Sequence, residues 1–220
     1  MRWNRIAVKT AVLAMLLIPL ALMSERPRPE YYLTPLDQYS RIGRALAIRY
    51  QPQLAAMPMR ILQEIRSDRF ELIDVNRSPM GSVGFWINPG VLVPEYRYLA
   101  VTARVNVKLI YFPDNNWGRV GDALDAFGKD MLRIAGDSLG EINDNSVRGV
   151  VMVLIYSKLE LDDPQYWDQA EAAVFFIPKA PLAKFNANRM TFQELFDQSD
   201  IYVFRGADEI NILFTQFLNG

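Results

Sequence analysis

The sequence predicts an α+β protein with one mixed or antiparallel β-sheet and packed helices, preceded by an N-terminal hydrophobic membrane segment. Three observations support this prediction: an apolar run over residues 10–23, apolar–polar alternation over residues 101–111, and a nearly continuous apolar run over residues 147–156. With 220 residues, of which 50% are hydrophobic, the chain has enough apolar side chains for one ordinary domain. We therefore expect a single domain over residues 34–220.

The first apolar run has the length and the flanks of a membrane segment. Counted from Ile6 to Met23, it reaches the lower end of the about 17 to 25 residues that span a bilayer. The two alternatives are a retained signal-anchor and a removed signal peptide over residues 1–23. The run does not end in the small-x-small pair that signal processing favours, so retention is the preferred interpretation. The residues expected in the bilayer are Ile6, Leu13, Leu16, Leu17, Ile18, Leu20 and Leu22.

Charge predicts the orientation of this segment. Arg2, Arg5 and Lys9 precede the apolar residues, and no acid lies among them. By the positive-inside rule, the N-terminus is cytoplasmic and the rest of the chain lies across the membrane. In a bacterium, this predicts a single-pass inner-membrane protein with a linker over residues 24–33 and a periplasmic domain. Cleavage would instead produce a secreted or periplasmic protein.

The first part of the domain is expected to contain two helices and a β-hairpin. Apolar residues at helical spacing predict a helix over residues 34–50, and a second helical pattern follows Pro58 and continues to Arg66. Alternation then predicts strands over residues 70–75 and 82–87, which the turn between them joins as a hairpin.

The second part of the domain is expected to supply the rest of the sheet and a long amphipathic helix that ends in the polar, Gly-containing stretch over residues 136–146. In chain order, the expected elements are a strand over 98–112, the helix over 120–134, a central strand over 147–156, a strand over 172–177, a loop over 178–188, a capping box at 191–194 that begins a short helix, and a strand pair over 201–204 and 210–214. This order favours helices packed on one sheet. A strongly curved, cone-like sheet around a helix is the alternative.

Composition excludes several classes of function. The chain has no cysteine and no histidine, which excludes disulfides, thiolate nucleophiles and Ser-His-Asp triads, and we expect no cofactor or metal. Lys and Arg number 24 against 25 Asp and Glu, a net charge of −1, which disfavours nucleic acid as a partner. The expected partners are the membrane and other envelope proteins, or further copies of the chain.

Carboxylates remain as candidates for catalysis. Glu160, Asp162 and Asp163 follow the predicted central strand, and Tyr166 and Trp167 lie close to them in the sequence. A pair of carboxylates hydrolyses glycosidic bonds when one is protonated and the other is ionised. The alternative is an Asp-Asp-Pro turn that ends a strand, and we prefer it, so an enzyme is not the expected function.

Aromatic residues on the predicted strands and at the chain end exceed what a small core needs. Some are expected at the surface as protein contacts, although the chain end can also dock on its own sheet. The sequence therefore predicts a membrane-anchored, extracytoplasmic interaction module of an envelope transport, secretion or assembly complex. The alternatives are a carboxylate hydrolase that acts on envelope glycans and a small-ligand-binding sensory domain. The interaction candidates are Phe85, Trp86, Tyr166, Trp167, Phe214 and Phe217.

Overall fold

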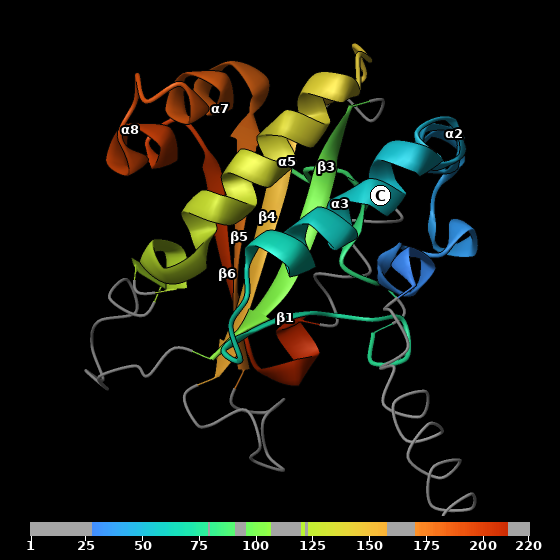
Figure 1. Ribbon diagram of the computed structural model, residues 1–220, viewed down its shortest axis with the longest axis horizontal. Helices are drawn as coiled ribbons and strands as arrows, with labels where there is room; N and C mark the ends of the chain where they lie inside the picture. Colours follow the sequence, from blue (N-terminus) through green and yellow to red (C-terminus); the bar gives the residue numbers. More distant parts are fainter. Residues whose placement is uncertain are drawn as a thin grey trace, which may run out of the picture.

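A computed structural model shows an α+β protein in which helices pack on a six-stranded mixed sheet (Figure 1). It describes residues 28–78, 80–90, 96–106, 120–121, 123–157 and 170–210. The α+β class and the mixed sheet with packed helices are thereby confirmed. The apolar run over residues 10–23 lies outside the described residues. Among the residues that are described, no helix combines the length and the apolar character needed to cross a bilayer.

The sheet has the strand order β1–β3–β4–β5–β6, and β2 also pairs with β3. β3 and β4 are parallel, and every other pair is antiparallel. The strand bounds are β1 Phe70–Leu72, β2 Val83–Trp86, β3 Arg97–Val105, β4 Val147–Ser157, β5 Ala170–Pro178 and β6 Asp200–Arg205.

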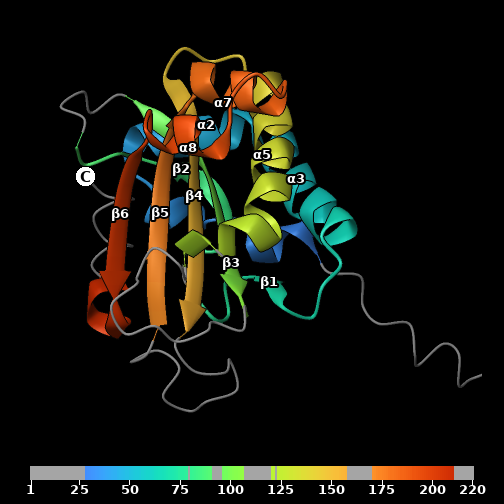
Figure 2. The ribbon, with the colours of Figure 1, turned by 90° about the vertical axis from the view of Figure 1, so that its left-hand side faces the viewer.

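The helices α3, α5 and α8 lie on one side of the sheet, with α5 against β3 and β4, α3 against α5 and β2, and α8 against β5 (Figure 2). Aromatic contacts join the two layers: the ring centroids of Phe70 and Phe127 are 5.3 Å apart, as are those of Phe175 and Phe196. The bounds are the 3₁₀ turns η1 Pro29–Tyr32 and η2 Leu36–Gln38, the helices α2 Arg41–Arg49 and α3 Gln51–Glu64, a π-helical turn η3 Leu124–Gly128, and the helices α5 Lys129–Glu141, α7 Lys179–Asn186 and α8 Phe192–Phe196.

β4 forms the centre of the sheet, as the apolar run over residues 147–156 predicts. From Val150 to Tyr156, no residue is more than 1% exposed. A strand that is covered on both faces needs no polar alternation, which explains the continuous apolar run. Arg148, near the start of β4, is exposed to solvent.

The predicted hairpin between residues 70–75 and 82–87 is wrong. β1 and β2 do not pair with each other: β2 pairs with the first half of β3 and β1 with its end. β3 is nine residues long and so accommodates both strands in succession along one edge. Ser82 bridges the gap between them, because its Oγ accepts a hydrogen bond from the Ile73 N–H at 2.5 Å and donates one to the Ile73 carbonyl at 2.8 Å.

One helix boundary differs from the prediction because tertiary packing overrides a local helix breaker. α3 begins at Gln51 and includes Pro58, which is buried inside the helix instead of preceding it. α5 ends at Glu141, within the polar stretch over residues 136–146 in which the predicted helix ends, and it includes Gly136. A Cβ atom at Gly136 would lie 2.2 Å from Nδ2 of Asn186 in α7, so the glycine allows the two helices to approach closely.

Three further segments complete the comparison with the prediction. The helix expected over residues 34–50 is divided into η2 and α2, because Ser40 between them has an extended ψ of 165°. The loop expected over residues 178–188 contains the helix α7, whose Leu182 is buried. β6 pairs with β5, and residue 210 is helical, so the strand expected over residues 210–214 does not begin there; the remainder of that strand lies outside the described residues. The capping box is confirmed at the start of α8.

The sheet is strongly curved at one end. Asn88, two residues after β2, donates a hydrogen bond from Nδ2 to Oδ2 of Asp200 in β6 at 2.7 Å. The hydroxyl of Tyr202, also in β6, donates to Oδ1 of Asn88 at 3.1 Å. β2 and β6 are four strand spacings apart in the sheet order, about 19 Å in a flat sheet. Curvature therefore brings these two strands together, and we call the three residues the Asn88 cluster.

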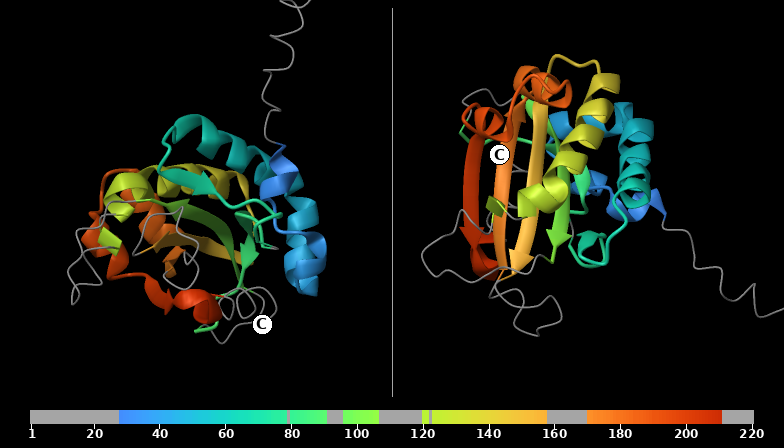
Figure 3. Two further views of the ribbon diagram at one scale, coloured as in Figure 1. Left: turned by 90° about the horizontal axis from the view of Figure 1, so that it is seen from below. Right: turned by 60° about the vertical axis from the view of Figure 1, so that its left-hand side comes forward.

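The inner face of this curve is packed with aromatic rings. Tyr98 of β3 and Phe176 of β5 have ring centroids 5.1 Å apart, although β4 lies between these strands. In β4, the partner of Tyr98 is Gly149, which has no side chain, and the partner of Phe176 is Val151. Phe175 points to the opposite, outer face, where it contacts Phe196 of α8. The curvature of the alternative prediction is therefore present, but α3, α5 and α8 lie outside the curve and not within it (Figure 3).

Candidate functional site

Most of the predicted site residues lie outside the described part of the chain. These are the carboxylates Glu160, Asp162 and Asp163, the aromatic residues Tyr166, Trp167, Phe214 and Phe217, and the membrane residues from Ile6 to Leu22. The hydrolase hypothesis and the contact surface expected at the chain end therefore stay predictions.

Phe85 and Trp86 belong to the core instead of a contact surface. Both lie in β2, and each is 1% exposed. The ring of Phe85 meets that of Tyr50 edge-on, with the centroids 6.5 Å apart. The expectation that this pair reaches the surface is wrong, because β2 pairs with β3 and is covered by α2 and α3 instead of forming one arm of a free hairpin.

An open pocket of about 490 Å³ lies at the end of the sheet where β3 and β4 begin and β5 ends. Parallel strands begin at the same end of a sheet, which places the first residues of β3 and β4 side by side. The lining residues are Tyr96 and Tyr98 from the start of β3, Asn145, Val147 and Arg148 around the start of β4, and Pro178, Lys179 and Ala180 from the junction of β5 and α7. We call this cavity the Arg148 pocket.

Two cations line the Arg148 pocket. The guanidinium carbon of Arg148 lies 3.7 Å from the centre of the Tyr96 ring, a cation–π contact. Nζ of Lys179 donates a hydrogen bond to the backbone carbonyl of Asp144 at 3.1 Å. Burial lowers the pKa of Lys179, Asp144 opposes this shift, and the positive charge of Arg148 adds to it. An anion bound between the two cations would relieve their mutual repulsion.

The side-chain carboxylate of Asp144, unlike its backbone carbonyl, accepts its hydrogen bonds from Ser146, Arg49 and Tyr50. Its Oδ1 accepts hydrogen bonds from Oγ of Ser146 at 2.7 Å and from the Ser146 N–H at 2.9 Å. Its Oδ2 accepts from Nη1 of Arg49 at 3.0 Å and from the hydroxyl of Tyr50 at 3.4 Å. The hydrogen bonds from Ser146, followed by the charge of Arg49, hold the pKa of Asp144 below its ordinary value. Asp144 is therefore ionised and hydrogen-bonded on both oxygens.

The Asn88 cluster lies beside Tyr98, which lines the Arg148 pocket together with Tyr96. Burial raises the pKa of Tyr98, and the negative charge of Asp200 raises it further, while a hydrogen bond with Asn88 lowers it. The surroundings of the pocket are thus cationic at Arg148 and Lys179 and acidic at Asp200. This arrangement is suited to a small anion whose negative group lies between the two cations.

Arg148, Lys179 and Tyr96 were not among the residues predicted from the sequence. Arg148 does carry a local signal, since it is a charged residue within the apolar run over residues 147–156. Lys179 carries none, because only the fold brings the end of β5 beside the start of β4.

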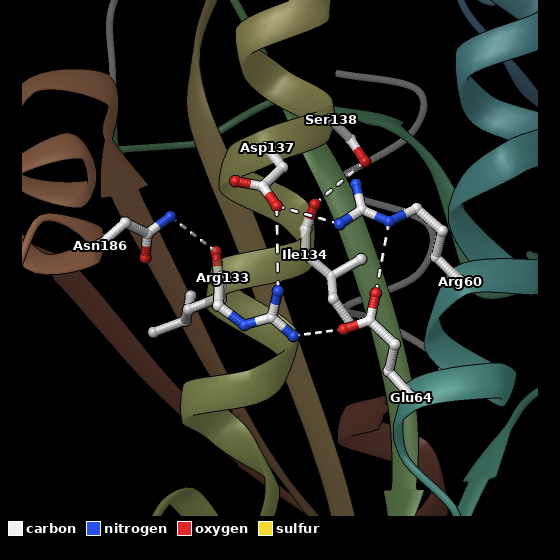
Figure 4. A network of polar contacts seen from close by, with 8 residues as sticks. Arg60, Glu64, Arg133, Ile134, Asp137, Ser138 and Asn186 are labelled. Carbon is white, nitrogen blue, oxygen red and sulfur yellow. Dashed lines mark hydrogen bonds and ion pairs between the residues drawn. The ribbon is translucent and has the colours of Figure 1, made fainter.

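A separate charged cluster joins α3 to α5 (Figure 4). Nη2 of Arg60 lies 2.9 Å from Oδ2 of Asp137, and its Nε lies 3.5 Å from Oε1 of Glu64. Arg133 pairs with Glu64, and its Nη1 lies 3.9 Å from Oδ2 of Asp137. Each arginine thus meets one acid on its own helix and one on the neighbouring helix. The charges of the four residues balance, so this cluster links the helices and is not a candidate binding site.

A hollow of about 570 Å³ lies between α5 and the loop that leads into α8. Nζ of Lys129 is 5.2 Å from the centre of the Phe192 ring at its edge. Asp130 also lines the hollow, and Glu64 holds Arg133 there. The hollow therefore lacks the excess positive charge of the Arg148 pocket.

The chain matches no protein-family model, no curated protein and no solved structure. Its function is accordingly inferred from its own residues and geometry.

Proposed function

We propose that the chain is a membrane-anchored, extracytoplasmic protein-interaction module, an accessory subunit of an envelope transport, secretion or assembly complex. The observation that carries this proposal is the apolar run over residues 10–23, with Arg2, Arg5 and Lys9 before it and no acid. The first described element, η1, begins at Pro29, six residues after the run ends. A short tether would hold such a domain close to the membrane.

The edge of the sheet at β6 supports the interaction part of the proposal. β6 is the last strand in the sheet order, and among the described strands it pairs with β5 alone. Val203 in the middle of β6 is 37% exposed. The edge strand of a sheet can accept a strand of another protein through its backbone groups. We therefore place the partner along β6.

Site-specific photocrosslinking in intact cells at native expression tests this proposal. A photoreactive residue replaces Val203, and the matched control carries it at Lys184, which is exposed on α7. We expect discrete envelope proteins to be captured from position 203 but not from position 184, with residues 1–23 retained on a membrane-bound chain. A released chain without residues 1–23, or the same unrelated proteins captured from both positions, would contradict the proposal.

A small-ligand-binding sensory domain is the second candidate, and the Arg148 pocket favours it. Two cations beside an aromatic wall are suited to small carboxylates or inorganic phosphate. Calorimetric titration of the full chain in mild detergent with these anions tests this candidate. We expect saturable binding that Arg148→Ala abolishes and that Arg66→Ala, at an exposed position after α3, leaves unchanged. Absence of saturable binding with every anion would exclude it.

A further inference from the structure

One flank of the domain exposes apolar and basic side chains together. In α2, Arg41, Arg44 and Ile48 are exposed and lie on one side of the helix because they are spaced by three and four residues. Ile48 is 59% exposed, and Leu36 in the neighbouring turn η2 is 47% exposed. Nε of Arg44 donates a hydrogen bond to the carbonyl of Leu36 at 2.8 Å, which holds η2 beside α2. We call the surface formed by Leu36, Arg41, Arg44, Ala45 and Ile48 the basic flank.

The opposite side of α2 faces the core. Gly43, Leu46 and Ala47 are buried, and a Cβ atom at Gly43 would lie 3.0 Å from the ring of Tyr39. α2 is therefore fixed with the basic flank outward, and the exposed position of Ile48 is a consequence of its packing. Burial of Ile48 requires a surface outside the described domain.

The charge of the flank favours an anionic surface. α2 contains three arginines and no acid. Arg49 turns away from the flank to Asp144, whereas Arg41 and Arg44 lie on the flank itself. Asp37 is the acid that η2 contributes nearby. Exposed arginines interleaved with apolar side chains are typical of helices that lie at the interface of anionic lipids.

The position of the apolar run shows which surface is within reach. If residues 6–23 lie in a bilayer, the chain from Met23 to Arg28 spans at most about 18 Å, at up to 3.6 Å per residue. The next described residues form η1, η2 and α2, which follow one another along one side of the domain in Figures 1 and 3. The flank that carries α2 is thus the part of the domain tied most directly to the membrane.

We propose that the basic flank lies on the lipid bilayer that holds the N-terminal segment, with Arg41 and Arg44 among anionic headgroups and Leu36 and Ile48 in the interface. This inference rests on the proposed membrane anchoring. It adds an orientation: with α2 against the bilayer, the domain does not rotate freely on its tether.

The absence of cysteine from the chain permits a direct test. The full chain with Ile48→Cys carries a polarity-sensitive fluorophore and is reconstituted into vesicles of phosphatidylglycerol and phosphatidylethanolamine, or of phosphatidylcholine alone. The matched control is Val203→Cys, another exposed apolar residue, on β6. On anionic vesicles, we expect a blue shift and loss of acrylamide quenching at position 48 but not at position 203. Phosphatidylcholine vesicles should give a smaller shift.

Charge reversal separates lipid contact from contact with the rest of the protein. Arg41→Glu with Arg44→Glu should restore quenching at position 48 on anionic vesicles. Arg41→Glu alone, which keeps the hydrogen bond from Arg44 to Leu36, should restore part of it. Extraction of the vesicles at alkaline pH reports anchoring independently, and loss of the chain there overturns the proposed function. An anchored chain with position 48 as quenchable as position 203 on both vesicle types overturns the orientation alone.

Discussion

At the scale of single residues, Asp144 shows how one side chain connects segments that are far apart in the sequence. Its carboxylate binds Arg49, which is 95 residues away at the end of α2, and Ser146, which precedes β4. Its carbonyl binds Lys179 of α7. Because the folded state holds the pKa of Asp144 below its ordinary value of 3.8, the ionised group stabilises the fold above that pH.

Replacement of Asp144 by Asn is expected to destabilise the domain by about 1 to 3 kcal/mol at neutral pH, because Arg49 and Ser146 lose an ionised acceptor. The stabilisation by Asp144 is lost as the pH falls through its folded pKa, so the difference between variant and wild type should close below about pH 4. Urea unfolding of the full chain in mild detergent, followed by tryptophan fluorescence across this pH range, measures the difference.

The control for this prediction is Asp68→Asn, an exposed aspartate between α3 and β1. We expect this variant to change the free energy of unfolding little at any pH. A loss of stability in Asp144→Asn that stays constant into acid would show that the carboxylate acts through its shape and not through its charge.

At the scale of elements, the four-residue cluster between α3 and α5 links two helices through partly exposed charges. The side chains of Arg60, Glu64, Arg133 and Asp137 are 34% to 49% exposed. Ion pairs with this exposure contribute little individually, since water screens them. The ion pairs therefore add only a small stabilisation to that from the apolar contacts of α5, where Met131, Leu132 and Ile134 are fully buried.

A double-mutant cycle with Arg60→Met and Asp137→Ala should give a coupling free energy of about 0.5 to 1 kcal/mol at low ionic strength. The coupling should fall at high salt, because exposed charges are screened over about 3 Å at 1 M. Chemical unfolding of the four variants measures it. In the control cycle, Arg66→Met replaces Arg60→Met and should show no coupling with Asp137→Ala. A large coupling that is insensitive to salt would mean that the pair acts by packing.

At the scale of the whole molecule, the curvature of the sheet brings the Asn88 cluster together. Asn88 and Asp200 are 112 residues apart, and they join strands from opposite ends of the sheet order. Asn88 is 4% exposed, and its amide serves both Asp200 and Tyr202. Its loss would remove the two hydrogen bonds that join the segment after β2 to β6.

We expect Asn88→Ala to destabilise the domain by about 1 to 3 kcal/mol, the usual result of removing one partner of part-buried polar groups. Amide hydrogen exchange should rise most in β2 and β6 and least in α5, because the cluster holds those two strands together. Exchange measured by mass spectrometry on the full chain checks this. The matched control is Asn143→Ala, exposed after α5. An equal rise in every element would argue against a local role.

The sequence by itself determined the elements whose signal is local. The continuous apolar run predicts the buried β4, alternation predicts β3, and the residues around Thr191 predict the capping box of α8. Each of these patterns reports the period or the burial of one segment. None of them depends on which other segment of the chain packs against it. The basic residues Arg2, Arg5 and Lys9 and the apolar run over residues 10–23 are also local signals of this kind.

Only the tertiary structure decided the pairing of β1 and β2 with β3, the path of α3 through Pro58, the curvature of the sheet and the Arg148 pocket. Phe85 illustrates the reason: its aromatic side chain suits a surface contact or a core equally, and the pairing of β2 makes it core. Contacts between residues far apart in the chain leave no period in the sequence. The pocket is such a case, because Arg148 and Lys179 become neighbours only when β4 and β5 pair.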